Sequence, residues 1–306
     1  MDIRKPVVLT NLSSSSSEDI SGQITALFTR YGYDTPTLIQ GQSSDMKTMM
    51  DAMRRAGGDV LVSYGGDGTG AAVASIAREQ NVPFIALPGG TMNMLMIGLY
   101  GTDDWQDCLI RGLASAAPRA MTAGKVYDSR GLQGQFMVGC MFGKPTQMSE
   151  AREELRDGQV GNAVSEALGA MRATKAAAPI HFAANGADFG RHALDLINVT
   201  CPFMDGQALD PDVFDITLFE TVTGGSTLSL GLAALLGNLK SSQEVEKVRT
   251  PVFRLRSDDP IEGLLDGEPH SFVGEVRVEL DKESGLVMAP HPAISFRTAR
   301  ARELRA

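Results

Sequence analysis

The fold is decided by the stretch Val60-Leu-Val-Ser-Tyr-Gly-Gly-Asp-Gly-Thr69, together with Pro83-Phe-Ile-Ala-Leu-Pro-Gly-Gly-Thr-Met-Asn93, which follows it after one helix length. In each case an apolar run typical of a buried strand leads into a glycine-rich turn. Glycine allows backbone amides to approach a ligand closely and to point toward it. Asp67 lies among the first glycines, and a carboxylate suits a phosphate site at which a divalent cation mediates the contact. The stretch therefore predicts a nucleotide site.

The first third of the chain alternates between strand and helix patterns. We expect strands over 7–9, 35–39, 60–63 and 83–87, and helices over 18–31, 45–56 and 70–79. Apolar strands that alternate with helices predict a parallel sheet covered on both faces. Ligands of such sheets bind beyond the carboxyl ends of the strands. Because Asn11 and both glycine turns directly follow strands, we expect them to converge on one edge of the sheet.

The pattern changes near residue 122. Beyond it the chain shows short strands separated by turn residues, the last of them over 285–288, with helical interruptions over 148–173 and 227–240. Many short strands with few crossover helices predict an antiparallel β-sandwich or a barrel-like domain, and we expect the sandwich. We therefore expect an α/β nucleotide-binding domain over 1–123 and a β-rich substrate domain over 124–289. The tail 290–306 is expected to pack back on the first domain or to lie exposed.

Composition and charge exclude several classes of protein. The 306 residues are 43% hydrophobic and 21% charged, which is ordinary for a globular chain. The net charge of −9 argues against a nucleic-acid partner held by phosphate neutralisation. Three cysteines far apart in sequence fit a reducing compartment rather than a disulfide framework. No signal-peptide pattern is visible, and no apolar run reaches the roughly 20 residues of a membrane span, so we expect a cytoplasmic protein.

The two turns also carry a family resemblance. Gly65-Gly-Asp-Gly-Thr69 and Leu87-Pro-Gly-Gly-Thr-Met-Asn93 resemble the paired motifs of the catalytic domain shared by diacylglycerol kinases, sphingosine kinases and bacterial lipid kinases. Leu265-Asp-Gly-Glu-Pro269 resembles a further family motif near the C-terminus, and Leu209–Ile216 resembles a segment of the family's second domain. The resemblance covers most of the chain.

This resemblance implies a two-domain lipid kinase with ATP in the cleft between the domains. The reaction would transfer the γ-phosphoryl group of ATP to the hydroxyl of a diacylglycerol-like lipid at a membrane surface, with Mg²⁺ as cofactor, as a step of phospholipid metabolism. The nucleotide-binding residues that it implies are Asn11, Thr37, Gly65, Gly66, Asp67, Gly68, Thr69, Gly70, Ala71, Gly90, Thr91 and Asn93. The alternative role of Asn93 is to cap the following helix.

Carboxylates of both domains are the expected catalytic groups. By match to the family, Glu268 is the general base that takes the proton from the lipid hydroxyl. Asp67 and Asp266 are expected to handle the catalytic magnesium. An Asp-Gly pair is, however, also a common hairpin turn, and a carboxylate in a loop needs no ligand. A further, structural magnesium is implied at Leu209, Asp212 and Phe214.

The chain departs from the family pattern near both turns. After Thr69 it has Gly70-Ala-Ala72 where the family usually has Leu-Asn-Glu, and after Asn93 it has Met94-Leu-Met96 in place of Asp-Phe-Ala. The two missing acidic positions leave open a non-catalytic nucleotide- or lipid-binding module. An NAD kinase-like enzyme shares the first turn, but its second turn is of a different type. The oligomeric state is open, with a homodimer as one option.

Overall fold

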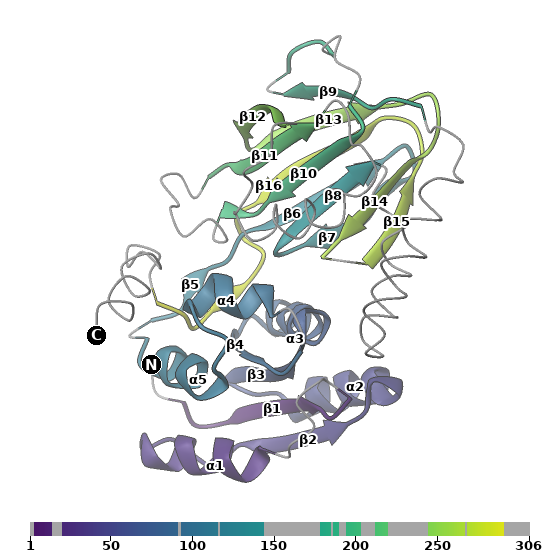
Figure 1. Ribbon diagram of the computed structural model, residues 1–306. Coiled ribbons are helices and arrows are strands. Elements are labelled where there is room, and N and C mark those ends of the chain that lie inside the picture. The colour runs from purple at the N-terminus through teal and green to yellow at the C-terminus, as the bar shows by residue number, and fades with distance from the viewer. Residues whose placement is uncertain are drawn as a thin grey trace, which may run out of the picture. The chain divides into compact units, whose positions relative to one another are not determined.

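The computed structural model describes two compact units (Figure 1). The first contains the described residues up to Thr122 together with those from Lys282 onward, and the second contains those from Ala123 to Asp281. The expected helices over 148–173 and 227–240, and the tail beyond Pro290, lie outside the described residues. The described residues are 3–13, 20–90, 93–115, 117–143, 178–184, 186–189, 194–202, 212–219, 244–266 and 268–290.

The first unit is built on a six-stranded sheet with the order β2-β1-β3-β4-β17-β5. Its first four strands pair in parallel, as the alternating pattern predicts. Asn11, Gly41, Gly65 and Pro88 therefore end these strands at one edge of the sheet. The strands are β1 (Pro6–Asn11), β2 (Thr37–Gly41), β3 (Val60–Gly65), β4 (Pro83–Pro88), β5 (Arg119–Ala120) and β17 (Leu286–Val287).

Helices cover both faces of this sheet (Figure 1). They are α1 (Ser21–Arg30), α2 (Met46–Ala56), α3 (Asp67–Gln80), α4 (Met94–Tyr100) and α5 (Trp105–Leu113), with the 3-10 turn η1 (Ser43–Asp45) before α2. Arg54 of α2 forms an ion pair with Glu79 of α3 at 2.8 Å. Gln106 of α5 donates a hydrogen bond to Gln23 of α1 at 3.4 Å, so these two pairs of helices lie side by side. In the described ranges, none of the helices has the length and apolar character needed to cross a membrane.

The second unit consists of two antiparallel sheets, as the sequence predicts for a β-sandwich. The six-stranded sheet has the order β12-β11-β10-β8-β14-β15, and the five-stranded sheet has the order β7-β6-β16-β13-β9. The strands of the first are β8 (Gly139–Gly143), β10 (Leu196–Thr200), β11 (Phe214–Phe219), β12 (Glu244–Thr250), β14 (Ile261–Leu265) and β15 (Glu268–Phe272). Those of the second are β6 (Ala123–Asp128), β7 (Gly131–Phe136), β9 (His181–Ala184), β13 (Val252–Arg256) and β16 (Val276–Asp281).

Aromatic rings hold these two sheets together. Phe253 of the five-stranded sheet lies 6.3 Å from Phe142 and 6.2 Å from Phe214 of the six-stranded sheet, both in edge-to-face geometry. Phe136 of β7 adds a further contact with Phe214 at 5.7 Å. All four side chains are buried, so the core of the second unit lies between its sheets.

One sequence-based assignment is wrong. The strand expected over 285–288 was placed in the second domain, yet β17 pairs in parallel with β4 and antiparallel with β5 in the sheet of the first unit. The described residues 282–290 belong to the first unit. β17 is only two residues long, which is too short a sequence pattern to reveal which sheet the strand joins. The path by which the chain returns to the first unit decides this.

The three cysteines are free thiols, and all are buried. Burial raises the pKa of each thiol, which leaves it protonated and unreactive at neutral pH. They act as small apolar core residues in this fold, as their scattered positions predict.

Candidate functional site

The two glycine turns are in direct backbone contact. The Gly89 N–H donates to the Gly65 carbonyl at 2.9 Å, which joins the ends of β3 and β4. A Cβ placed on Gly90 would lie 2.5 Å from the Cα of Gly66. Because no side chain tolerates so close an approach to backbone, glycine is required where the turns cross. The structure thus brings together Gly65, Gly66 and Gly90, three of the residues predicted from the motifs.

Helix α3 begins inside the first turn. Gly66 is its N-cap, in extended backbone, and no described side chain caps this end. The first helical hydrogen bond runs from the Gly70 N–H to the Gly66 carbonyl at 3.0 Å, so the amides of Asp67, Gly68 and Thr69 have no acceptor within the helix. The space beside Gly68 is open in the described structure. A helix N-terminus of this kind carries partial positive charge and suits an anion.

Asn11, the last residue of β1, connects the first turn to two neighbouring loops. Its side-chain amide donates to Thr69 Oγ1 at 3.1 Å and to Ser43 Oγ at 3.2 Å, and its Oδ1 accepts from the Ser13 N–H at 3.1 Å. Asn11 and Thr69 are both buried. Motif matching missed Ser13 and Ser43. The available signal was position, since Ser43 closely follows β2 as Ser13 follows β1.

Asn93 closes the second turn, and Asp67 connects that turn with the first. The Asn93 side chain accepts from the Gly90 N–H and donates to the Gly90 carbonyl, both at 2.8 Å, and its backbone is left-handed with φ 49°. It therefore closes its own turn and makes no capping bond to α4, the alternative role expected for it. Asp67 accepts from the Leu95 N–H at 2.8 Å and so binds the start of α4. The carboxylate among the glycines is thus held at the junction of the two turns.

In the second unit, the Asp266 carboxylate binds a backbone turn. Its Oδ1 accepts from the N–H groups of Val138 and Gly139 at 2.9 and 3.0 Å, and its Oδ2 accepts from the Met137 N–H at 2.7 Å. The Asp266 N–H donates back to the Gly139 carbonyl at 3.0 Å. Burial raises the pKa of the Cys201 thiol, and the negative charge of Asp266 raises it further. These contacts show the carboxylate embedded in the fold.

Glu268 lies two residues beyond Asp266. It is the first residue of β15 and pairs with Leu265 of β14 across the hairpin turn. The residue is exposed, as a proton acceptor for an incoming substrate must be. β15 is the last strand in the order of its sheet, and among the described strands only β14 pairs with it.

The turns, α3 and Asn11 have a counterpart among known proteins. The family model of the diacylglycerol kinase catalytic domain matches residues 5–126, which include all of them. Over these residues the chain is similar to the diacylglycerol kinase catalytic-domain family. Among curated proteins, none matches the chain significantly by sequence.

Solved structures share the fold of both units. A candidate diacylglycerol kinase from Bacillus anthracis str. Sterne has a TM-score of 0.68 at 13% identity, over 95% of this chain and 98% of that one. A diacylglycerol kinase from the same organism has a TM-score of 0.64 at 12% identity, over 96% and 99%. A further candidate diacylglycerol kinase gives 0.65 at 15% identity, over 96% and 99%. Identities this low show the fold alone, and they confirm the α/β domain followed by an antiparallel sandwich.

Thr37 is not brought to the glycine turns of the diacylglycerol kinase catalytic domain. It is the first residue of β2 and pairs with Val7, whereas Gly41 at the other end of β2 pairs with Asn11. Four strand residues separate the two ends by about 13 Å. At the end near the turns, the side chain of Gln40 donates instead to Ser21 Oγ. The other expected residues of this group include Ala71, which lies in α3, and Thr91, which is outside the described residues.

The expected structural magnesium site of the kinase fold stays a prediction. Asp212 is exposed in the turn before β11, and Phe214 begins that strand with its side chain fully buried in the sandwich core. Leu209 lies outside the described residues. Across the described ranges, no group of three or more His, Cys, Asp or Glu side chains is arranged to hold a metal ion.

The departures from the diacylglycerol kinase pattern have a packing explanation. A Cβ on Gly70 would lie 2.9 Å from Leu95 Cδ2 and 3.4 Å from Met96 Cε. α3 and α4 therefore approach each other closely at Gly70, and the apolar residues of α4 fill the space that a larger residue at position 70 would take. The substitutions in the two helices are coupled, because each suits the other.

Proposed function

We propose that this protein is an ATP-dependent lipid kinase that phosphorylates the hydroxyl of a diacylglycerol-like lipid. The observation that supports this best is the contact between Gly66 and Gly90 at the uncapped start of α3. α3 begins there without a side-chain cap, so backbone amides of its first turn are directed away from the helix. No side chain fits at Gly90, where the two turns cross. Such an arrangement suits the phosphates of a nucleotide. The family of residues 5–126 favours a kinase over other nucleotide-binding proteins.

The residues present fit ATP with magnesium. Amides at the start of α3, from Gly66 to Thr69, would hold the phosphates, with Asn11 fixing Thr69 beneath them. Asp67, at the junction of the turns, offers a carboxylate oxygen of the kind that Mg²⁺ takes together with nucleotide phosphates. When bound, the metal ion would neutralise charge on the transferred phosphoryl group.

Glu268 is the proposed general base. Its carboxylate would take the proton of the lipid hydroxyl as that oxygen attacks the terminal phosphorus. The proposal requires the nucleotide held by the first unit and Glu268 of the second to meet at the lipid. With a lipid substrate, the enzyme would work at a membrane surface, which it approaches from one side. We place this reaction in the reducing interior of the cell, as a step of phospholipid metabolism. We include a homodimer among the expected assemblies.

The test measures phosphate transfer from ATP and Mg²⁺ to a panel of lipid alcohols in mixed micelles, comprising diacylglycerol, a sphingoid base and phosphatidylglycerol. Glu268→Gln should lower kcat by about 10²–10⁴, and Asp67→Asn should weaken nucleotide binding. Glu262→Gln is the matched control, because Glu262 lies on the same hairpin and bonds to Ser271 at 2.7 Å.

Binding of ATP, followed by calorimetry, separates the alternatives. Nucleotide binding without transfer to any lipid would indicate the non-catalytic module that the missing acidic positions leave open. Phosphorylation of NAD in place of lipids would indicate the NAD kinase-like alternative. Full activity of Glu268→Gln would eliminate the assigned base.

A further inference from the structure

The Asp266 carboxylate joins two parts of the sandwich that are far apart in sequence. Asp266 directly follows β14, at the start of the hairpin turn between β14 and β15. The amides that it accepts belong to residues 137–139, where the chain leaves β7 of the five-stranded sheet and enters β8 of the six-stranded sheet. One side chain thus ties the hairpin to the crossover between sheets.

The backbone conformation at Asp266 is uncommon for a residue with a side chain. Its φ of 48° is in the left-handed region, which side chains other than glycine, asparagine and aspartate rarely adopt. The conformation directs the carboxylate at three amides while the Asp266 N–H reaches the Gly139 carbonyl. A carboxylate offers about four acceptor positions, and three are occupied here. A magnesium ion would have to compete with these hydrogen bonds.

Glu268 follows this anchor by two residues. It begins β15, and among the described strands only β14 pairs with β15. Asp266 therefore holds the chain to the crossover immediately before Glu268. Movement of an acidic group by about 1 Å is enough to cost on the order of 10² in rate, because proton transfer needs hydrogen-bond contact with the attacking hydroxyl.

We propose that Asp266 is a positioning residue, which holds the base hairpin to the Met137–Gly139 crossover and so sets the place of Glu268, rather than a magnesium ligand. This inference rests on the proposed kinase function. It assigns the two carboxylates of the Asp266-Gly-Glu268 motif different roles. Glu268 meets the substrate, whereas Asp266 acts through the backbone.

Asp266→Asn tests the assignment, because asparagine keeps the oxygen that serves Val138 and Gly139 but turns an NH₂ toward the Met137 N–H. We expect kcat to fall about 10- to 100-fold, while KM for ATP and lipid and the Mg²⁺ concentration for half-maximal rate change less than about twofold. A several-fold rise in the Mg²⁺ requirement would show a metal ligand and overturn the proposal. An unchanged kcat would overturn it as well.

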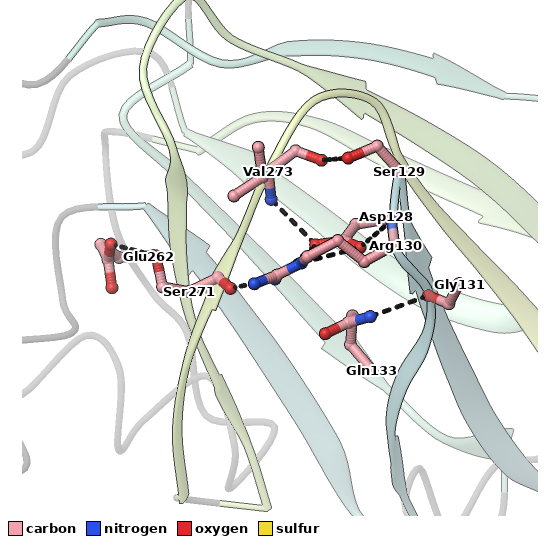
Figure 2. Close-up of polar contacts among 8 residues, drawn as sticks. All are labelled: Asp128, Ser129, Arg130, Gly131, Gln133, Glu262, Ser271 and Val273. Carbon is pink, nitrogen blue, oxygen red and sulfur yellow. Dashed lines mark hydrogen bonds and ion pairs between the residues drawn. The ribbon is translucent and has the colours of Figure 1, made fainter.

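Asp128→Asn is the matched control in the same unit. Asp128 also anchors a loop through backbone, accepting from the Val273 N–H at 2.9 Å (Figure 2), but this contact lies just past the Phe272 end of β15, five residues from Glu268. We expect it to lower the unfolding midpoint as Asp266→Asn does, with kcat retained. An equal loss of kcat in Asp128→Asn would show that the loss in Asp266→Asn comes from general destabilisation, which would overturn the proposal.

A spectroscopic measurement separates this proposal from the kinase assignment. The side-chain ¹³C carboxyl resonance of Glu268, identified by its absence in Glu268→Gln, should shift or broaden in Asp266→Asn and stay in place in Asp128→Asn. This readout needs no turnover. A shifted resonance in a protein that phosphorylates no lipid would support the anchor and reject the kinase function, whereas an unmoved resonance would reject the anchor whatever the activity.

Discussion

At Gly90 the chain has no room for any side chain. The Cα of Gly66 occupies the place that a Cβ would take, and the Gly90 N–H and carbonyl are both bonded to the Asn93 side chain. The turn cannot move away from the first turn without losing the hydrogen bond from the Gly89 N–H to the Gly65 carbonyl. The proposed nucleotide site therefore depends on close backbone approach, which one added methyl group is sufficient to disturb.

Gly90→Ala should force the two turns apart. Overpacking of this kind costs about 1–3 kcal/mol, which corresponds to about 5- to 150-fold if it appears in ATP affinity. Calorimetric titration with ATP measures the loss of affinity, and urea unfolding measures the loss of stability. Gly22→Ala is the control, because Gly22 is exposed in α1 and nothing lies within 4 Å of an added Cβ. It should leave ATP affinity unchanged and raise stability by about 0.5–1 kcal/mol.

Unaltered ATP affinity in Gly90→Ala would contradict the role proposed for the contact between Gly66 and Gly90.

Among the elements, the turn between β6 and β7 is joined to the segment after β15 by a polar cluster (Figure 2). Arg130 forms an ion pair with Asp128 at 2.5 Å and donates to the Ser271 carbonyl at 2.8 Å. Ser129 bonds to the Val273 carbonyl through its N–H and hydroxyl. The Asp128 side chain is fully buried beneath these contacts, whereas Arg130 is half exposed. Two hairpins of the five- and six-stranded sheets are thereby locked together at one end.

This cluster predicts a pH dependence of stability. Hydrogen bonds from the Arg130 guanidinium, with those from the Val273 and Arg130 amides, lower the pKa of Asp128 to about 2. The unfolded value is about 3.9. Because the folded pKa is the lower one, the stabilisation is complete above about pH 4 and is lost as pH falls toward 2. Urea midpoints between pH 2 and 6 should show a smaller acid loss in Asp128→Asn than in the wild type. Parallel curves for the two proteins would contradict this.

For the whole molecule, the chain's return to the first unit matters most. After the second unit, β17 inserts between β4 and β5, and the buried Tyr100 hydroxyl donates to the Met288 carbonyl at 3.0 Å. The same hydroxyl accepts from the Ala86 N–H at 3.3 Å. Burial raises the pKa of Tyr100, so the hydroxyl stays protonated and able to donate. Residues near both ends of the described chain are therefore needed to complete one sheet.

Tyr100→Phe should destabilise the first unit. It leaves the Met288 carbonyl without this partner in a buried place, at a cost of about 1–3 kcal/mol. Thermal and urea unfolding measure the loss. Tyr31→Phe, at an exposed tyrosine, should change stability by less than about 0.5 kcal/mol. Equal stability of the two variants would show that the return segment is not fixed through Tyr100.

The parallel strands of the first unit were predictable, because buried β-strands read as apolar runs that end at glycine or asparagine. The residues Asn11, Gly66 and Gly90 were predictable as one group, since the carboxyl ends of parallel strands share an edge. Thr37 was not, because a residue in the right segment can still lie at the wrong end of its strand. Ser43 was missed for the opposite reason, as it matches no motif and only the register of β1 with β2 brings it to Asn11.

The sequence by itself determined the fold class and the glycine turns, because both depend on local patterns of a few residues. The tertiary structure alone decided three things: that the turns touch, that β17 completes the first sheet, and that Asp266 binds the amides of the crossover between sheets. Each of these joins segments separated along the chain, by about two dozen residues in the first case and by more than a hundred in the others. Contacts of that kind follow from how complete elements pack, and no short stretch of sequence records them.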